Sequence, residues 1–119
     1  MLKELWKRMI FNLCISNTDD HLRNHGFLLS DEGWHLSPCF DMNPDPEKDH
    51  MALFVGNSTK KSLDNALKMA DYYRISEDEA RESISHIQEV IKNEWEKQAD
   101  MLKISRSEKE RMRNAFLSF

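Results

Sequence analysis

The positions of the prolines constrain the fold of this chain more than any other feature. Its 119 residues include three prolines, Pro38, Pro44 and Pro46, which lie close together. Proline interrupts a helix because it lacks the backbone N–H and its ring clashes with the preceding turn. Residues 37–50, which contain the prolines and show no periodicity, are therefore predicted to be irregular. Long helices are confined to either side, and with few glycines the composition favours a mainly helical chain.

Residues 2–15 are predicted to form the helix that precedes the irregular segment. Apolar residues recur at steps of three and four, which places them on one helical face that can form part of a core. The members of this face are Leu2, Leu5, Trp6, Met9, Ile10 and Leu13. The pattern ends at residues 16–20, Ser-Asn-Thr-Asp-Asp, whose side chains bond to nearby backbone and favour turns.

Further helices are predicted in the second half of the chain. Residues 62–74 carry apolar side chains at helical spacing. Two capping boxes, Ser76–Glu79 and Ser105–Glu108, then mark two more helix starts, because the serine hydroxyl and glutamate carboxylate of each box can bond to free backbone N–H groups. The helix after the first box is expected to keep one apolar face. This face consists of Ala80, Ile84, Ile87, Ile91, Trp95 and Leu102.

A β-hairpin is predicted between the first helix and the prolines. Gly26–Leu29 and Trp34–Leu36 are short apolar segments that flank the turn Ser30–Gly33, which ends in glycine. Residues 51–55 are predicted to form a third short strand, which ends at a Gly-Asn pair.

Together these elements predict a single domain over residues 1–119, mainly α with a small β-hairpin. It consists of a helix in 1–16, a loop and hairpin in 17–50, and a helical subdomain in 62–119. The sequence has no run of about 20 apolar residues, as a membrane span requires, and its first residues lack the layout of a secretory signal. We therefore expect a cytoplasmic protein with no membrane contact.

The charge is unevenly divided along the chain. The net charge is −4, but residues 17–50 alone carry two basic and eight acidic residues, whereas 1–16 has a net charge of +2 and 51–119 is neutral. A single acidic segment suits a divalent cation better than nucleic acid, which requires a basic patch. Lys60, Lys61 and the basic residues near the C-terminus are interpreted as solvated, so no direct binding of nucleic acid is expected.

Cysteine and histidine do not predict a zinc site. Cys14 and Cys39 lack a CxxC spacing and indicate neither a zinc site nor a disulfide framework, so both are expected to be buried thiols. His21 and His25 lie four residues apart, but no helix carries them and zinc would need further ligands.

Polar residues that suit a magnesium site flank the predicted hairpin. Asp19 and Asn24 lie in the loop before it, and Asp41 follows it. A hairpin brings its two ends together, so these side chains are expected to converge, and they offer the oxygen ligands that Mg²⁺ prefers. In kinases, a loop Asp accepts the substrate proton, an Asn shortly after it holds a metal, and an Asp beyond a hairpin holds the metal that bridges the phosphates. The three residues fit this layout.

Two segments resemble the motifs of a known family. Residues 18–24, Thr-Asp-Asp-His-Leu-Arg-Asn, resemble the T-D-x-H-x-x-N catalytic loop of HipA-like serine/threonine kinases, the toxins of bacterial toxin–antitoxin pairs. Residues 36–41, Leu-Ser-Pro-Cys-Phe-Asp, resemble the L-x-P-x-[FY]-D segment that takes the place of the kinase D-F-G motif in that family. The resemblance extends over the whole chain and implies the fold of the C-terminal lobe of such a kinase.

The resemblance implies a role for each matching residue. Asp19 would be the catalytic base, and Asn24 and Asp41 would be magnesium ligands, with Asp41 also at the nucleotide. His21 would lie near the nucleotide or support the loop. Asp20 falls at a variable position of the motif and receives no role. The implied cofactors are Mg²⁺ and ATP.

The resemblance also implies partners. The phosphorylated target would be a protein hydroxyl, for example on a translation component such as an aminoacyl-tRNA synthetase, and a DNA-binding antitoxin would be the regulatory partner. The glycine-rich phosphate loop and nucleotide-pairing lysine of such kinases belong to their other lobe and have no counterpart in these 119 residues. A complementing N-terminal kinase lobe is therefore a further expected partner.

A second interpretation of the function stays open. Positioning of phosphate and metal supplies nearly all of the catalysis in phosphoryl transfer. A chain without the nucleotide-binding half is alternatively a truncated, catalytically incomplete lobe that serves as an interaction module or is an inactive remnant. Without the Asp41 segment, residues 17–24 would be interpreted as a helix exit followed by a turn.

Overall fold

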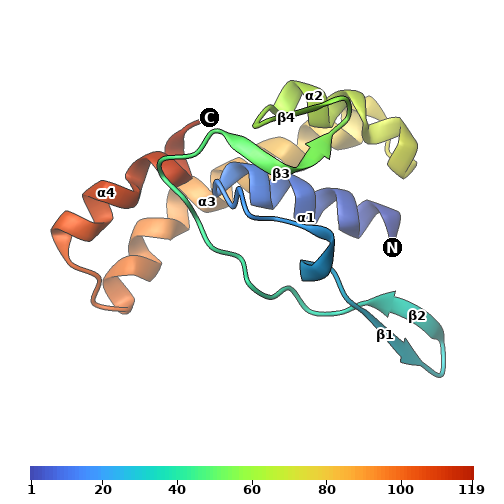
Figure 1. The fold of residues 1–119 in the computed structure, drawn as a ribbon, viewed down its shortest axis with the longest axis horizontal. Helices are drawn as coiled ribbons and strands as arrows, with labels where there is room; N and C mark the ends of the chain where they lie inside the picture. Colours follow the sequence, from blue (N-terminus) through green and yellow to red (C-terminus); the bar gives the residue numbers. More distant parts are fainter.

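The computed structural model describes the backbone of residues 1–119 and every side chain except that of Phe54 (Figure 1). The described residues form four α-helices and two antiparallel hairpins, which confirms the predicted fold class and adds a second hairpin. The helices are α1 (Leu2–Cys14), α2 (Leu63–Lys68), α3 (Glu77–Met101) and α4 (Arg106–Leu117), with the 3-10 helices η1 (Leu22–Asn24) and η2 (Ala70–Tyr73). The strands are β1 (Phe27–Ser30), β2 (Gly33–Leu36), β3 (His50–Val55) and β4 (Ser58–Lys60).

The core lies between α1 and the helices of the second half of the chain. In Figure 1, α3 runs behind α1, and α4 follows it at one end of the molecule. Trp6 and Ile10 of α1 are fully buried, in the same cluster as Ile84 of α3. The Trp6 indole N–H donates to the carbonyl oxygen of Ala66 at 3.2 Å, which satisfies the polar atom of this buried ring. The apolar face predicted for the first helix therefore packs into the core except at its start, where Leu2 is exposed.

Serine caps define the starts of α3 and α4, as predicted. The Ser76 hydroxyl accepts a hydrogen bond from the backbone N–H of Glu79 at 3.2 Å, and the Ser105 hydroxyl accepts one from Glu108 at 3.2 Å. The Glu79 carboxylate instead pairs with Lys3 of α1 at 3.2 Å. A tertiary ion pair thus takes the place of the carboxylate half of that capping box.

The helix α3 has 25 residues and supplies several of the buried side chains of the core. Ala80, Ile84, Ile91 and Trp95 are buried along it. Leu102 was expected to continue this face, but the helix ends before it and its side chain is 74% exposed. No helix among the described residues has both the length and the apolar character needed to cross a membrane.

The C-terminal helix α4 packs against the end of α3 through aromatic contacts. The Phe116 ring stacks on Trp95 with centroids 4.9 Å apart and an angle of 11° between the planes. The Arg113 guanidinium lies 5.3 Å from the Trp95 ring centroid. Ala115 is fully buried, so the C-terminal part of the helix is packed against the body.

The helix predicted over residues 62–74 is interrupted. It ends as α2 at Lys68, and the chain continues through η2 to Arg74, whose φ of 59° is left-handed. A left-handed residue cannot continue an α-helix. It turns the chain so that Ile75 is buried just before α3 begins. The helical pattern of residues 62–74 is therefore formed as two short helices, α2 and η2, and stops at the predicted end.

The strand predicted at residues 51–55 has a partner that was not predicted. It forms β3, which pairs with β4 so that His50 lies opposite Lys60 and Val55 opposite Ser58. The three residues of β4 are Ser-Thr-Lys, so this strand lacks the alternation of apolar and polar residues that marks a half-buried strand. Val55 is buried, and in Figure 1 β3 lies over α1.

The first hairpin agrees with the prediction and stands apart from the core. Strands β1 and β2 pair in antiparallel register with Ser30 opposite Gly33, which leaves a two-residue turn. Gly33 has a left-handed φ of 110°, a conformation that glycine adopts without strain. Figure 1 shows this hairpin projecting from the helical body.

One face of the projecting hairpin is apolar. Residues directly opposite each other in a strand pair lie on the same face, and the register groups Phe27 with Leu36 and Leu29 with Trp34. We refer to these four side chains as the hairpin face. Phe27, Leu29 and Trp34 are 52%, 66% and 64% exposed. Contiguous apolar side chains outside a core mark an interaction surface.

The two cysteines lie in different environments. Cys14 is buried at the end of α1, as predicted, but Cys39 is exposed, so the prediction for Cys39 is wrong. Cys39 lies in the irregular segment after β2, which runs over the surface, and the adjacent Phe40 is also exposed. Apolar neighbours in the sequence do not bury a thiol when the segment itself lies outside the core.

Candidate functional site

The loop that follows α1 carries the first group of candidate residues. Ser16 has a left-handed backbone, with a φ of 61°, and turns the chain as α1 ends. Asn17 and Thr18 are buried, whereas Asp19 is exposed. The loop therefore presents the Asp19 carboxylate to solvent between buried neighbours.

Hydrogen bonds to two other segments fix this loop. The backbone N–H of Asn17 donates to the Asn12 carbonyl at 2.9 Å, and the Asn17 side-chain amide donates to Asn12 Oδ1 at 2.8 Å. The Thr18 carbonyl accepts from the backbone N–H of Ala52 in β3 at 2.8 Å. The loop is thus bonded both to the last turns of α1 and to the second hairpin.

Asp20 has a structural role that its place in the motif did not indicate. Its carboxylate is buried and lies 2.6 Å from Nε2 of His25. The two residues stand on either side of η1, so the pair closes the loop across the short helix that carries Asn24. The sequence does place an aspartate and a histidine five residues apart. That spacing alone does not predict a contact, because it is common among exposed residues that do not pair.

Asn24 lies in a small polar pocket between the loop and the segment after β2. The pocket has a volume of about 10 Å³, which is room for about one water molecule. Its lining residues are Arg8, Asn12, Asn17, Asp20, Asn24, His25, Cys39, Phe40 and Met42. The two segments that carry the sequence motifs therefore meet at this pocket.

The three residues predicted to converge occupy different positions around the pocket. Asn24 lines it, whereas Asp19 and Asp41 do not, although the neighbours of Asp41 do. Asp41 is exposed, has a left-handed φ of 55°, and accepts a hydrogen bond at Oδ1 from Asn43 Nδ2 at 2.6 Å. The structure brings the two chain segments together and leaves both carboxylates exposed.

Arg8 of α1 anchors the segment that leads to Asp41. Its Nη1 donates to the carbonyl oxygen of Ser37 at 2.6 Å, and its Nε donates to Glu4 at 3.0 Å. Hydrogen bonds from a charged group are stronger than neutral ones. The bond to Ser37 fixes the end of β2 on α1, a long-range contact that no local pattern indicated.

Three buried polar atoms near the candidate site have no hydrogen-bond partner among the described residues. They are Asn17 Oδ1, His21 Nδ1 and Asn24 Nδ2. Such atoms are rare because each costs about 1–3 kcal/mol when it is left unpaired. Asn17 and Asn24 line the same polar pocket, so one small polar molecule there could pair with both.

The side chains near the pocket suit magnesium better than a metal that is bound by protein side chains alone. Among the described side chains, no three His, Cys, Asp or Glu lie close enough together to hold a metal. Mg²⁺ is usually bound by one or two carboxylates, waters and substrate phosphates. Asn24 and Asp41 offer an amide oxygen and an exposed carboxylate of this kind. By their chemistry, these two side chains would fit a magnesium ion that takes its other ligands from water and phosphate oxygens.

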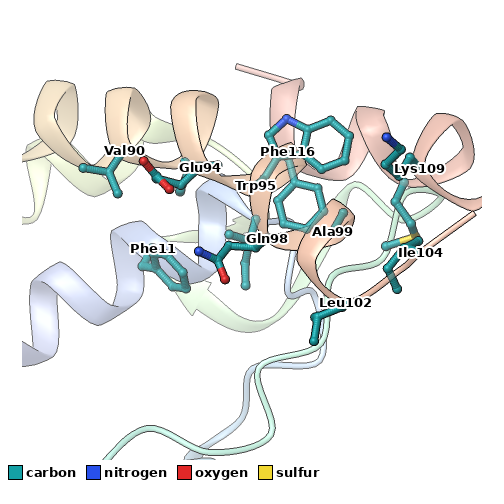
Figure 2. Close-up of a pocket in the computed structure, with 13 residues that line it drawn as sticks. Phe11, Val90, Glu94, Trp95, Gln98, Ala99, Leu102, Ile104, Lys109 and Phe116 are labelled. Atoms are coloured by element: carbon teal, nitrogen blue, oxygen red, sulfur yellow. The ribbon is translucent and has the colours of Figure 1, made fainter. Parts of the chain in front are cut away.

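A larger cavity lies away from these residues, between α1, α3 and α4. Its volume is about 390 Å³. Figure 2 shows Phe11 of α1 on one side and the stacked Trp95 and Phe116 on the other, with Leu102 and Ile104 near the end of α3. The lining is mainly apolar. Phosphoryl transfer needs charged and polar groups, so this cavity is not the candidate site.

Comparison with protein-family models identifies the family of this arrangement. The model described as the HipA-like C-terminal domain matches residues 1–95. The chain belongs to the HipA-like C-terminal domain family. This match confirms the resemblance and identifies the domain as the C-terminal part of a HipA-like kinase. Comparisons with curated proteins and with solved structures find no match.

The matched part of the HipA-like C-terminal domain contains the candidate site. Residues 18–24 and 36–41, the first hairpin and the polar pocket all fall within residues 1–95. The helix α4 lies beyond the matched residues. The hydrogen bond from the Ser16 hydroxyl to the Ala115 carbonyl of α4 is therefore a feature that the family match does not cover.

Proposed function

We propose that this HipA-like C-terminal domain is the catalytic and magnesium-binding part of an ATP-dependent serine/threonine protein kinase, which transfers the γ-phosphate to a protein hydroxyl. One observation carries the proposal. The loop with Asp19 and Asn24 and the segment with Asp41 belong to a HipA-like domain and meet at one polar pocket.

In this proposal Asp19 is the catalytic base. Its carboxylate accepts the proton of the substrate hydroxyl as the hydroxyl oxygen attacks the γ-phosphorus and the bond from that phosphorus to the bridging oxygen breaks, which releases ADP. Two features support the assignment. The carboxylate is exposed, so a protein substrate can reach it, and its neighbours Thr18 and Asp20 are buried and hydrogen-bonded, which restricts its position.

Asn24 and Asp41 are proposed to hold magnesium, with Asp41 at the nucleotide phosphates. When bound, Mg²⁺ neutralises the negative charge of the transferred phosphate. His21 is proposed to lie near the nucleotide or to support the loop. Its unpaired, buried Nδ1 supports either role, because a ligand or a loop shift could supply the partner that the described residues do not.

The proposal includes a second polypeptide segment that supplies the nucleotide-binding lobe. The hairpin face supports this partner, because an isolated two-stranded hairpin is only marginally stable in water and this one exposes large apolar side chains. A translation component as substrate, a DNA-binding antitoxin as regulator and a cytoplasmic location are parts of the same proposal. The substrate and the regulator rest on the family alone.

The test is transfer of labelled γ-phosphate from ATP, measured with and without a separately supplied N-terminal lobe. Asp19→Asn should abolish transfer by the complete kinase, because the amide cannot accept the proton. Asp31→Asn is the matched control, since Asp31 is also an exposed aspartate but lies in the hairpin turn. Full transfer by Asp19→Asn would refute the role of Asp19.

The exposed hairpin face also supports a second function, that of an incomplete lobe acting as an interaction module. Calorimetric titration of the chain with Mg-ATP separates the two functions. Tight binding by these 119 residues alone would count against the interaction module. Binding that requires a complementing polypeptide would support a kinase whose site is shared between two parts.

A further inference from the structure

Ser16 connects the candidate catalytic loop to the C-terminal helix. Its side chain is fully buried, and its hydroxyl donates to the carbonyl oxygen of Ala115 in α4 at 2.7 Å. Its own carbonyl accepts hydrogen bonds from the backbone N–H groups of Thr18 and Asp45, each at 2.9 Å. One residue therefore joins α4, the loop and the segment between the two hairpins.

Lys61 reaches the same hydroxyl from the end of the second hairpin. Its Nζ donates to Ser16 Oγ at 2.8 Å and to Ser118 Oγ at 2.8 Å, and lies 5.2 Å from the ring centroid of Phe119. Lys61 is thus half-buried, whereas the sequence suggested a solvated side chain. Burial lowers the pKa of its ammonium, and the charge of Asp49 partly opposes this shift.

The contacts of Lys61 are two hydroxyl groups and an aromatic face. A half-buried ammonium loses hydration, so its neighbours must replace the hydrogen bonds that water would make. Hydroxyl acceptors and an aromatic face can do so, and bonds from a charged donor are the stronger kind. The position of the ammonium therefore depends on the C-terminal residues that surround it.

We propose that Lys61 is a positioning residue for the catalytic loop, and that residues 115–119 act on the loop through it and through Ser16. Ser16 is the left-handed residue that starts the loop presenting Asp19. Its hydroxyl is bonded to Lys61 and to Ala115 together, so a shift of either partner changes the start of the loop. Residues 96–119 lie beyond the family match. The catalytic meaning rests on the proposed function, but the coupling itself does not.

The test is amide hydrogen exchange of the full chain, followed residue by residue by NMR. The reporters are Asn17, Asp45 and Ala52, whose N–H groups bond across the loop. Lys61→Met removes the ammonium and keeps most of the stem, and it should lower protection at these amides by about tenfold or more, the size expected for a hydrogen bond to a charged group. Lys60→Met, at the exposed neighbour, is the matched control and should leave protection unchanged.

Two further variants separate positioning from general stability. Lys61→Arg keeps a cationic donor and should restore most of the protection. Ser118→Ala, at an exposed terminal position that does not endanger folding, should lower protection at the same reporters. Combining it with Lys61→Met should add little, because the two residues act through one contact.

Three results would overturn the proposal. The first is unchanged protection of the reporter amides in both Lys61→Met and Ser118→Ala. The second is an equal loss of protection at core amides of α3 such as Ile84. The third is a failure of Lys61→Arg to restore protection. Because this measurement needs no activity, it is independent of the proposed function. In an active reconstituted kinase, Lys61→Met should lower kcat and leave the KM for ATP unchanged. If Asp19→Asn did not abolish transfer, the proposed role of Asp19 would be refuted, but the proposed coupling between residues 115–119 and the loop would still stand.

Discussion

Asp19 and Asp20 show how two neighbouring carboxylates take different roles. Asp20 is buried against His25 and closes the loop, whereas Asp19 is exposed. A buried carboxylate needs a partner because it is costly to desolvate, while an exposed one can exchange a proton with a substrate. The motif predicted a role for Asp19, but no periodicity in a short loop could have told which of two adjacent residues faces inward.

Replacing each aspartate should therefore affect a different property. Asp20→Ala leaves the half-buried His25 without its partner and should lower the free energy of unfolding by about 1–3 kcal/mol. Asp19→Ala removes an exposed group and should change it by no more than about 0.5 kcal/mol. Urea unfolding followed by circular dichroism measures both. Equal effects of the two substitutions would contradict the assigned burial.

The two cysteines should differ sharply in reactivity. Burial raises the pKa of the Cys14 thiol to about 12, and the thiolate is the reactive form. A thiol reagent at neutral pH should modify the exposed Cys39 in the native protein and Cys14 only after unfolding. Mass spectrometry of Cys39→Ser, with and without denaturant, checks this. Rapid labelling of the native variant would show that Cys14 is accessible.

Because the Cys14 thiol is buried, the free energy of unfolding should depend on pH in the alkaline range. In the unfolded chain Cys14 ionises near its ordinary pKa of 9.0, whereas in the folded chain its pKa is about 12. The contribution of the neutral thiol to the free energy of unfolding is therefore complete below pH 9 and is lost as the pH rises toward 12. The slope of this loss is at most about 1.4 kcal/mol per pH unit. Unfolding of Cys14→Ala between these pH values should show a shallower loss of stability than the unmodified chain.

Among the elements, those with local signals were predicted and those held by distant contacts were not. The amphipathic α1, the serine caps of α3 and α4 and the first hairpin each depend on residues close together in sequence. The strand β4 is short and polar, and α2 gives way to the 3-10 helix η2 within a segment whose apolar spacing is helical throughout. No local pattern reveals either one.

The cap of α3 offers a test at this scale. Ser76→Ala removes the acceptor for the Glu79 N–H and should destabilise the protein by about 1 kcal/mol. Ser85→Ala makes the same chemical change at an exposed position inside α3 and should be neutral or slightly stabilising, because alanine favours helices. Thermal unfolding of the two variants gives the comparison. Similar shifts for both would show that the cap contributes nothing.

The whole molecule divides into a packed helical body and a projecting hairpin. The candidate site lies where they join, and its support comes from both ends of the chain, since Arg8 holds the segment after β2 and Ser16 bonds to Ala115. The motifs predicted that the two flanks of the hairpin meet. They could not predict the supporting contacts, which join residues far apart in sequence.

The hairpin face should matter for association and not for stability. Trp34→Ser replaces a side chain outside the core, so the free energy of unfolding should change by no more than about 0.5 kcal/mol. The affinity of the Trp34→Ser variant for a supplied N-terminal lobe should fall by about tenfold or more, as expected when a buried aromatic contact is lost from an interface. Calorimetric titration measures the affinity. His35→Ser, exposed on the opposite face of the hairpin, is the control and should bind normally.

The three tryptophans make the chain its own fluorescent reporter. Trp6 and Trp95 are 0% and 8% exposed, within the helical body, whereas Trp34 is 64% exposed on the hairpin. Emission from Trp34 should therefore lie at longer wavelength and be quenched by iodide, and emission from the other two should not. Any partner that covers the hairpin would shift and protect the first signal alone, so an unlabelled sample can report separately on association and on unfolding.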